Sequence, residues 1–307
     1  MKVSIITVCK NAEATIEQAI QSIVSQTFPM LEYIVIDGAS DDRTLEILHR
    51  YGDAIAHLVS EPDAGIYAAM NKGIHLATGD FLYFLNADDY LFDSTVIQDL
   101  VQFVVEHPDC DFVYGDHEAR FPGGNASIHS PAPAEHMLEE LVSLGECLIQ
   151  PASFFKADLF ERLGFFREDF RIASDYEWFS RLFQAPDVRI YYYPRTLVSY
   201  SHGGVSSQIR PLFEEVFAIQ NQIPLYQAEP WADRRLQKLQ RSFIDKYDAL
   251  ERVHRRNRHL EQELAAAKRH IAALEGAIAA MQSSKFWRLR SLWFRLKRAI
   301  GLTKESD

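Results

Sequence analysis

Short apolar runs alternate with amphipathic stretches over the first ninety residues. Four apolar runs have the length of buried strands: 3–8, 33–36, 55–59 and 81–85. The stretches between them place apolar residues three or four positions apart and predict helices: 13–26, 43–51 and 66–76. This alternation is typical of an α/β fold with a mostly parallel sheet and right-handed crossovers.

The pattern continues less regularly to about residue 230. We predict strands over 112–114, 189–193 and 196–200, the last two joined by Pro194, and a helix over 176–183. Residues 121–134 are polar and rich in Pro and Gly, which indicates a loop. Such a loop closes over a substrate in some enzymes, and a plain surface connection is an equal alternative.

A heptad pattern begins at Leu236 and continues without proline for more than six heptads. One seam position is occupied by Leu236, Phe243, Leu250, Asn257, Leu264, Ile271 and Ile278. A lone Asn in such a seam commonly fixes the register of a parallel pair, so we predict a homodimer through a coiled coil over 231–282. A long helix folded back on the body is the alternative.

The last segment, 283–307, is basic and amphipathic. Residues 283–304 carry seven basic and no acidic side chains, and Phe286, Leu289, Trp293, Leu296 and Ile300 share one helical face. Basic charge beside Trp and Phe favours peripheral contact with an anionic membrane surface. A protein groove and nucleic acid are the alternatives.

Charge divides the chain into two regions. Residues 1–230 contain 14 basic and 34 acidic groups, whereas 231–307 contain 18 basic and 9 acidic groups. The acidic body argues against nucleic acid as a ligand. Three cysteines without metal-type spacing, a start unlike a signal peptide and the lack of an 18-residue apolar run indicate a cytoplasmic protein.

Acidic side chains follow three of the predicted strands, at Asp37, Asp63 and Asp88. The carboxyl ends of parallel strands meet at one edge, where ligands bind in open α/β sheets. Hard oxygen ligands there predict a divalent cation, Mg²⁺ or Mn²⁺, with substrate phosphates completing its shell. The alternative is that Asp88 or Asp89 caps a following helix. The first strand lacks the glycine-rich phosphate loops of dehydrogenases and P-loop enzymes.

Six segments in order resemble family 2 glycosyltransferases: SIITVCKNAE at 4–13, DGASDD at 37–42, EPDAGIY at 61–67, MNKG at 70–73, TGD at 78–80 and NADD at 86–89. The resemblance covers roughly 1–220. It implies a GT-A domain over 1–230 and an inverting, metal-dependent transfer from a nucleotide sugar.

The resemblance also implies roles by position. Donor-binding residues are Thr7, Asn11, Asp37, Asp63, Asn71, Lys72, Asn86 and Asp88. Asp88 matches the metal-binding acid of a D-x-D motif, but Asn86 replaces its first carboxylate and carries no charge. Asp89 is more consistent with a structural role. His202, followed by two glycines, is a second candidate metal ligand, and a structural turn histidine is the alternative.

The resemblance places the catalytic base at Asp175, within FFREDFRIASDYEW at 165–178. An inverting displacement needs a carboxylate that takes the proton of the acceptor hydroxyl, and a helix N-terminus favours its ionised form. A cap of that helix by Asp175 or Ser174 is the alternative. Gln150 is a weaker candidate on the acceptor side.

We therefore expect a glycosyltransferase of bacterial cell-surface polysaccharide synthesis, acting on a glycan or lipid-linked acceptor at the inner face of the membrane. The competing hypothesis is a catalytically weak or inactive body that serves as a coiled-coil scaffold, which Asn86 favours.

Overall fold

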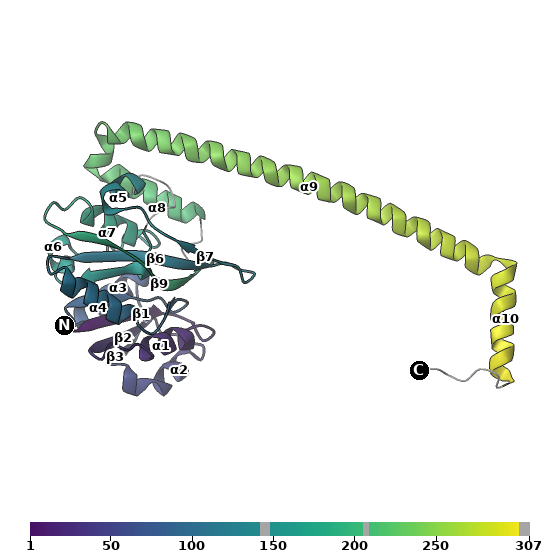
Figure 1. Cartoon of the computed structure of the whole chain (residues 1–307), viewed down its shortest axis with the longest axis horizontal. Helices are drawn as coiled ribbons and strands as arrows, with labels where there is room; N and C mark the ends of the chain where they lie inside the picture. The colour runs from purple at the N-terminus through teal and green to yellow at the C-terminus, as the bar shows by residue number, and fades with distance from the viewer. Residues whose placement is uncertain (142–147, 205–208, 301–307) are drawn as a thin grey trace. The chain divides into compact units, whose positions relative to one another are not determined.

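The computed structural model describes residues 1–141, 148–204 and 209–300. It divides into two compact units, Met1–Leu239 and Gln240–Asp307. One of the three cysteines, Cys147, the residues 205–208 that follow the two glycines after His202, and the last seven residues of the predicted tail lie outside the described residues. Figure 1 shows the elements of both units.

In the described residues of the first unit, a nine-stranded sheet forms the frame, in the order β3-β2-β1-β4-β8-β6-β9-β5, with β7 paired to β6. Its strands are β1 (Val3–Cys9), β2 (Leu31–Asp37), β3 (His57–Ser60), β4 (Phe81–Phe84), β5 (Tyr90–Leu91), β6 (Phe112–Arg120), β7 (Ala126–His129), β8 (Ser153–Lys156) and β9 (Ile190–Ser201). The first four neighbours, β3, β2, β1 and β4, are parallel, as the alternating pattern predicts. The sheet becomes mixed at β8, which pairs antiparallel with both β4 and β6.

Helices cover both faces of this sheet (Figure 1). They are α1 (Ile16–Val24), α2 (Thr44–Arg50), α3 (Ile66–Leu76), α4 (Val96–Glu106), α5 (Ala134–Glu140), α6 (Leu159–Leu163), α7 (Ser174–Leu182) and α8 (Ile209–Gln222). Successive residues of a strand point to opposite faces. Leu82 and Phe84 accordingly pack into one apolar core with α3, α7 and α8, whereas Phe81 and Tyr83 pack into a second core with α1, α2 and α4.

Two predictions in the second half of the body were wrong in detail. Residues 121–134 do not form a plain loop, because β7 pairs antiparallel with β6 and makes a hairpin. Figure 1 shows this hairpin at the label β7. Pro194 does not separate two strands, because β9 is continuous and its register against β6 shifts from Gly115–Tyr193 to Asp116–Thr196. The residues without a partner at this shift include Pro194, which has no N–H to donate to a ladder.

The second unit and the residues just before it are helical. Helix α9 (Trp231–Ser283) follows the short 3-10 segment Pro224–Gln227, and α10 (Lys285–Ala299) follows α9. Ser284 caps α10 by accepting a hydrogen bond from the N–H of Trp287. No residue of α9 is buried in the single chain, including the seam residues Leu250, Leu264 and Ile271. Among the described residues, no helix combines the length and the hydropathy that crossing a membrane requires.

Candidate active site

The ends of four parallel strands place the predicted donor residues along one edge of the sheet. Register pairs Cys9 of β1 with Asp37 of β2, and Asp37 with Ser60 of β3. The N–H of Leu85, just past β4, donates to the carbonyl of Ile6 in β1. Thr7 at the end of β1, Asp37 and the turn that follows β4 therefore lie along the same edge.

Asp37 is fully buried and its carboxylate is well supplied with donors. Oδ2 accepts from the N–H of Ser40 at 3.0 Å and from the hydroxyl of Ser60 at 2.7 Å. Oδ1 accepts from the Ser40 hydroxyl and from the Cys9 thiol. Burial of Cys9, followed by the charge of Asp37, raises the pKa of that thiol far above its ordinary value. The Asp37 carboxylate thus organises the turn after β2, and its predicted donor contact stays a prediction.

Asn11 connects the turns after β1 and β2. Its N–H donates to the Ser40 hydroxyl at 2.8 Å, and its side-chain oxygen accepts from the N–H of Asp41 at 3.0 Å. Asn11 and Ala39 both have a positive φ, +52° and +56°. Left-handed backbone is unfavourable for alanine in particular and is concentrated at functional sites. The two turns are therefore held in a specific shape beside the predicted nucleoside position.

Asp63 lies against the turn after β2. A Cβ on Gly38 would come within 2.6 Å of Asp63 Oδ2, so a larger residue at position 38 would displace that carboxylate. The other oxygen, Oδ1, accepts from the N–H of Gly65 at 3.0 Å. Gly65 immediately precedes α3. Asp63 thus connects the turn after Asp37 with the start of α3.

The two carboxylates of the turn NADD, Asp88 and Asp89, lie in different environments. Asp89 is 1% exposed, and it accepts from the N–H of Ser201 at 2.7 Å and from the Asn86 amide at 3.1 Å. Burial, and then repulsion by Asp88, raises the pKa of Asp89 to about 7. Asp89 thus fastens the end of β4 to β9. Asp88 is half-buried, and burial raises the pKa of its carboxyl group, with the charge of Arg120 opposing that shift.

The glycine turn after β9 approaches Asp88. A Cβ on Gly204 would lie 3.4 Å from Asp88 Oδ2, an ordinary contact distance. His202 is exposed, donates its N–H to the carbonyl of Arg120 at 2.8 Å and stacks its ring on Phe121 at 4.9 Å. The structure thus brings the 202–204 turn next to Asp88, and a metal contact by His202 stays a prediction.

Metal-binding groups are sparse at this edge. Across 1–141, 148–204 and 209–300, no three His, Cys, Asp or Glu side chains gather as they would in a closed metal cage. The buried side-chain oxygen of Asn86 has no hydrogen-bond partner among the described residues. That oxygen is therefore available to a substrate, and the single accessible carboxylate of Asp88 beside it fits a cation whose remaining ligands come largely from the substrate, as is usual for Mg²⁺.

The side chains of Asn71 and Lys72 contact other residues of the protein in this structure. The Asn71 amide donates to the carbonyl of Phe166 at 2.9 Å and accepts from the N–H of Phe166 at 3.1 Å. Lys72, which is partly exposed, pairs with Glu61 at 2.7 Å. Asn71 therefore holds the segment before α7 against α3. The donor contacts of both residues stay predictions.

Asp175 lies in the first turn of α7, as the sequence predicts. Its Oδ1 accepts from the N–H of Tyr176 at 2.8 Å and from the hydroxyl of Tyr67 at 2.9 Å. Burial raises the pKa of Asp175, and these two hydrogen bonds oppose the shift. The competing cap, Ser174, has a buried hydroxyl without a described partner. A carboxylate with a raised pKa beside α3 is suited to general-base chemistry.

Three supporting residues did not emerge as functional from the sequence. Tyr67 stands in a segment that carries the resemblance, yet its contact with Asp175 spans 108 positions. Glu215 of α8 accepts from the N–H groups of the three residues at 171–173, at 2.8–2.9 Å. Arg120 donates to the carbonyl of Asp88 at 2.6 Å and lies 4.4 Å from the Tyr90 ring. No short-range pattern marks Glu215 or Arg120.

A family model described as "Glycosyl transferase family 2" matches residues 4–164, more than half of the chain. The chain belongs to glycosyl transferase family 2. A relative named "PGL/p-HBAD biosynthesis glycosyltransferase", from Mycobacterium bovis strain BCG, is 30% identical over 213 residues, which is 67% of this chain and 79% of the relative. The family membership confirms the predicted resemblance, and the chain is a glycosyltransferase.

Solved structures show the same fold. TarS of S. aureus aligns with a TM-score of 0.58 and 22% identity, over 78% of this chain and 42% of TarS. The mannosyltransferase PcManGT of Pyrobaculum calidifontis, solved with GDP-Man and Mn²⁺, aligns with a TM-score of 0.52 and 20% identity, over 81% of this chain and 80% of PcManGT. These similarities confirm the predicted GT-A fold of the family 2 body.

Proposed function

We propose that this glycosyltransferase moves a sugar with inversion from a nucleotide-sugar donor to a hydroxyl of a glycan or lipid-linked acceptor. The process we assign it to is the synthesis of bacterial cell-surface polysaccharide or glycolipid. The observation that carries the proposal is the position of Asp175. It is a half-buried carboxylate held by Tyr67, and Tyr67 lies on the helix that begins beside Asp63. The turn that carries Asp63 and the proposed base Asp175 are thus both attached to α3.

The donor side of the proposal uses the strand-end residues. Thr7, Asn11, Asp37 and Asp63 would surround the nucleoside, Asn71 and Lys72 would lie near the diphosphate, and Asn86 would contact ribose or sugar. Bound donors support this assignment in similar structures: TarS has been solved with UDP-GlcNAc, and PcManGT with GDP-Man. We propose Mg²⁺ or Mn²⁺ at Asp88, with His202 as a second ligand. When bound, the cation would stabilise the charge of the departing diphosphate.

The acceptor side requires only proton removal. The acceptor oxygen forms a bond to the anomeric carbon while the bond from that carbon to the diphosphate oxygen breaks. The electron pair of the broken bond leaves with the nucleotide diphosphate. Asp175 takes the proton of the acceptor hydroxyl as the new bond forms. A single displacement of this kind needs no covalent nucleophile.

Nucleotide release tests the reaction. With UDP- and GDP-sugars, Mn²⁺ and a cell-surface glycan acceptor, we expect release of one nucleotide type well above background. A chelator should abolish the release, and excess Mn²⁺ should restore it. An inactive scaffold, which Asn86 favours, would release no nucleotide from any donor, including a donor whose binding raises the melting temperature.

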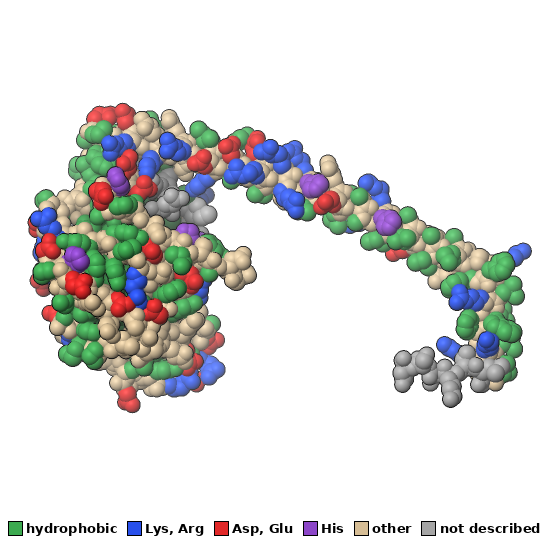
Figure 2. All heavy atoms as spheres, in the orientation of Figure 1, with side chains coloured by type: hydrophobic (Ala, Val, Ile, Leu, Met, Phe, Trp, Pro, Cys, Tyr) green, Lys and Arg blue, Asp and Glu red, His purple; other side chains and the backbone are tan. Residues whose placement is uncertain are grey.

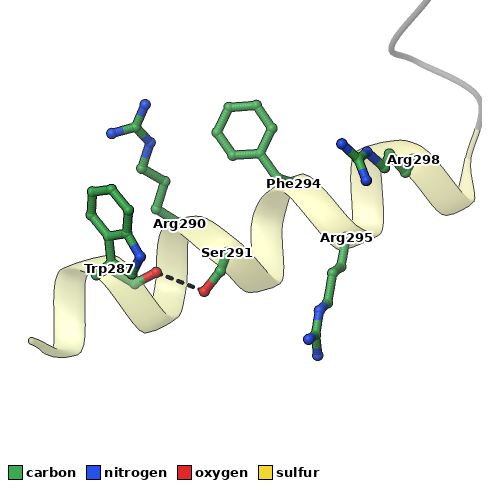
Figure 3. Close-up of a pocket in the computed structure, with 6 residues that line it drawn as sticks. All are labelled: Trp287, Arg290, Ser291, Phe294, Arg295 and Arg298. Atoms are coloured by element: carbon green, nitrogen blue, oxygen red, sulfur yellow. Dashed lines mark hydrogen bonds between the residues drawn. The ribbon is translucent and has the colours of Figure 1, made fainter. Parts of the chain in front are cut away.

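We propose that α9 forms the predicted parallel coiled coil with a second copy. Isolated helices depend on tertiary packing for most of their stability, and the apolar seam of α9 is uncovered in the single chain. We further propose that α10 holds the enzyme at the inner face of the membrane. Its Arg290 lies between Trp287 and Phe294, 5.4 and 5.6 Å from their rings (Figure 3). Figure 2 shows Lys and Arg side chains, and no acidic ones, among the apolar side chains of this helix.

Vesicle binding and light scattering of the full chain test both roles. We expect twice the 35.2 kDa mass of one chain, and sedimentation with phosphatidylglycerol vesicles but not with phosphatidylcholine vesicles. Arg290→Glu/Arg298→Glu should lower the affinity for phosphatidylglycerol vesicles at least about tenfold, because each basic residue contributes about 1 kcal/mol of binding free energy near an anionic surface. Arg252→Glu/Arg255→Glu on α9 makes the same charge change and should have little effect. A mass equal to that of one chain would contradict the proposed dimer. An equal loss of vesicle binding in both variants would contradict the proposed role of α10.

A further inference from the structure

The hydroxyl of Tyr67 lies between two acceptors. Its oxygen is 2.7 Å from the carbonyl oxygen of Ile172 and 2.9 Å from Oδ1 of Asp175. A phenol has one proton, so it cannot make a full hydrogen bond to both at once. The Tyr67 side chain is 5% exposed, which excludes bulk water as an easy substitute. The proton is therefore drawn toward whichever acceptor carries more negative charge.

The surrounding contacts fix where both acceptors lie. Glu215 of α8 holds the N–H groups of residues 171–173, so the carbonyl of Ile172 cannot turn away freely. On the other side, Asn71 of α3 holds both backbone groups of Phe166. The Tyr67 ring packs on Phe166, with 5.7 Å between their centroids. Helices α3 and α8 thus grip the segment that leads into Asp175 from two directions.

The two oxygens of Asp175 differ as a result. Oδ1 accepts from both Tyr67 and the N–H of Tyr176. Within the described part of the chain, no other residue donates a hydrogen bond to Oδ2. A proton taken from an acceptor hydroxyl therefore has one oxygen with room for it, and the bonds on Oδ1 fix the plane of the carboxylate.

We propose that Tyr67 is a positioning residue for the base: its hydroxyl holds Oδ1 of Asp175, leaves Oδ2 to take the proton, and sets the pH at which the base works. This inference rests on the proposed role of Asp175. When Asp175 is ionised, Tyr67 donates to it and favours the charged form. When Oδ2 has been protonated, the carboxyl group attracts that donor less, and the Tyr67 proton turns toward the carbonyl of Ile172.

The groups around Asp175 define the expected direction of a change in pH dependence. Burial raises its pKa, the charge of Glu215 on α8 raises it further, and the donors Tyr67 and Tyr176 lower it. The base must be ionised to accept a proton, so activity falls as the pH falls through this pKa. The Tyr67 hydroxyl lowers the pKa of Asp175, so its loss should raise that pKa and move the acid limb of the rate profile to higher pH.

Tyr67→Phe in the full chain tests the inference. We expect the acid limb of the kcat profile to move up by about one pH unit, with kcat at neutral pH reduced by about tenfold and the KM for the donor nearly unchanged. Tyr191→Phe is the matched control. It removes a tyrosine hydroxyl that donates to the carboxylate of Asp109, in the turn before β6 and at the opposite end of the sheet from the strand-end site, and should leave the profile in place.

A fluorinated tyrosine at position 67 should shift the acid limb of the kcat profile in the opposite direction. Its phenol is a stronger donor, so the acid limb should move to lower pH while the shape of the side chain is almost preserved. This variant gives a result even if Tyr67→Phe folds poorly. A uniform fall in kcat without any shift of the limb in either variant would overturn the inference and leave a packing role. Full turnover in Asp175→Asn would instead remove the proposed base itself, so the two failures are distinguishable.

Discussion

Asp175→Asn is expected to reduce sugar transfer by about 10³-fold, within the usual contribution of a general base. The amide has nearly the shape of the carboxylate, and its oxygen can still accept from Tyr67 and from the N–H of Tyr176. It cannot take a proton from the acceptor at neutral pH. Nucleotide binding should survive, because Asp175 lies on α7 and the proposed nucleoside contacts lie at the ends of β1–β3. Transfer rates and donor titration by calorimetry measure the two effects separately.

Ser174→Ala is the matched control for this variant. Ser174 is the neighbouring residue, fully buried, and its hydroxyl has no partner among the described residues. If Asp175 only stabilised α7, Asp175→Asn would lower the melting temperature without a selective loss of transfer, whereas Ser174→Ala removes an unpartnered hydroxyl and should change neither. Normal turnover in Asp175→Asn would exclude Asp175 as the base. A parallel loss of donor binding would show that the variant disturbs the whole site.

The parallel half of the sheet could be predicted from the sequence because its signals are local. The strands β1, β2 and β4 are apolar runs that end abruptly at turn residues, and α1 and α3 have clear helical spacing. The later strands gave weaker signals. Strand β5 has two residues and β8 has four, and both depend on partners far along the chain, as in the pairing of Tyr83 with Phe154. The two residues of β5 are too few for any periodicity to develop.

The candidate site divides in the same way. Acids at strand ends could be placed on one edge from the sequence, because parallel strands bring their carboxyl ends together. The sequence already favoured a structural role for Asp89 beside Asp88, but the contact that gives Asp89 this role, with the N–H of Ser201 112 positions away, is visible only in the structure. The same holds for Glu215 and for the hydroxyl of Tyr67. Hydrogen bonds between distant elements leave no mark on local sequence, and these bonds decide which polar residues remain available to a substrate.

Asp88→Asn is expected to weaken binding of the divalent cation and to slow sugar transfer sharply. Asp89 is committed to Ser201 and Asn86, and Asn86 is neutral, so Asp88 is the carboxylate of this turn that remains free to neutralise a cation. A cation on the leaving diphosphate contributes several kcal/mol, so we expect transfer at saturating donor to fall by about 10³-fold. The Mn²⁺ concentration needed for half-maximal rate should rise well above that of the unmodified enzyme.

Two measurements separate loss of the cation from loss of the fold. Paramagnetic resonance of Mn²⁺ in the presence of the nucleotide diphosphate should show weaker binding in Asp88→Asn. Asp53→Asn, which changes an exposed acid in the 3-10 helix Gly52–Ala54 before β3, should bind as before. The melting temperature should change little, because Asp88 makes its described hydrogen bond through its backbone carbonyl, to Arg120, which the substitution retains. An unchanged Mn²⁺ dependence in Asp88→Asn would mean that other groups hold the cation, and it would leave the diphosphate without the proposed ligand at the end of β4.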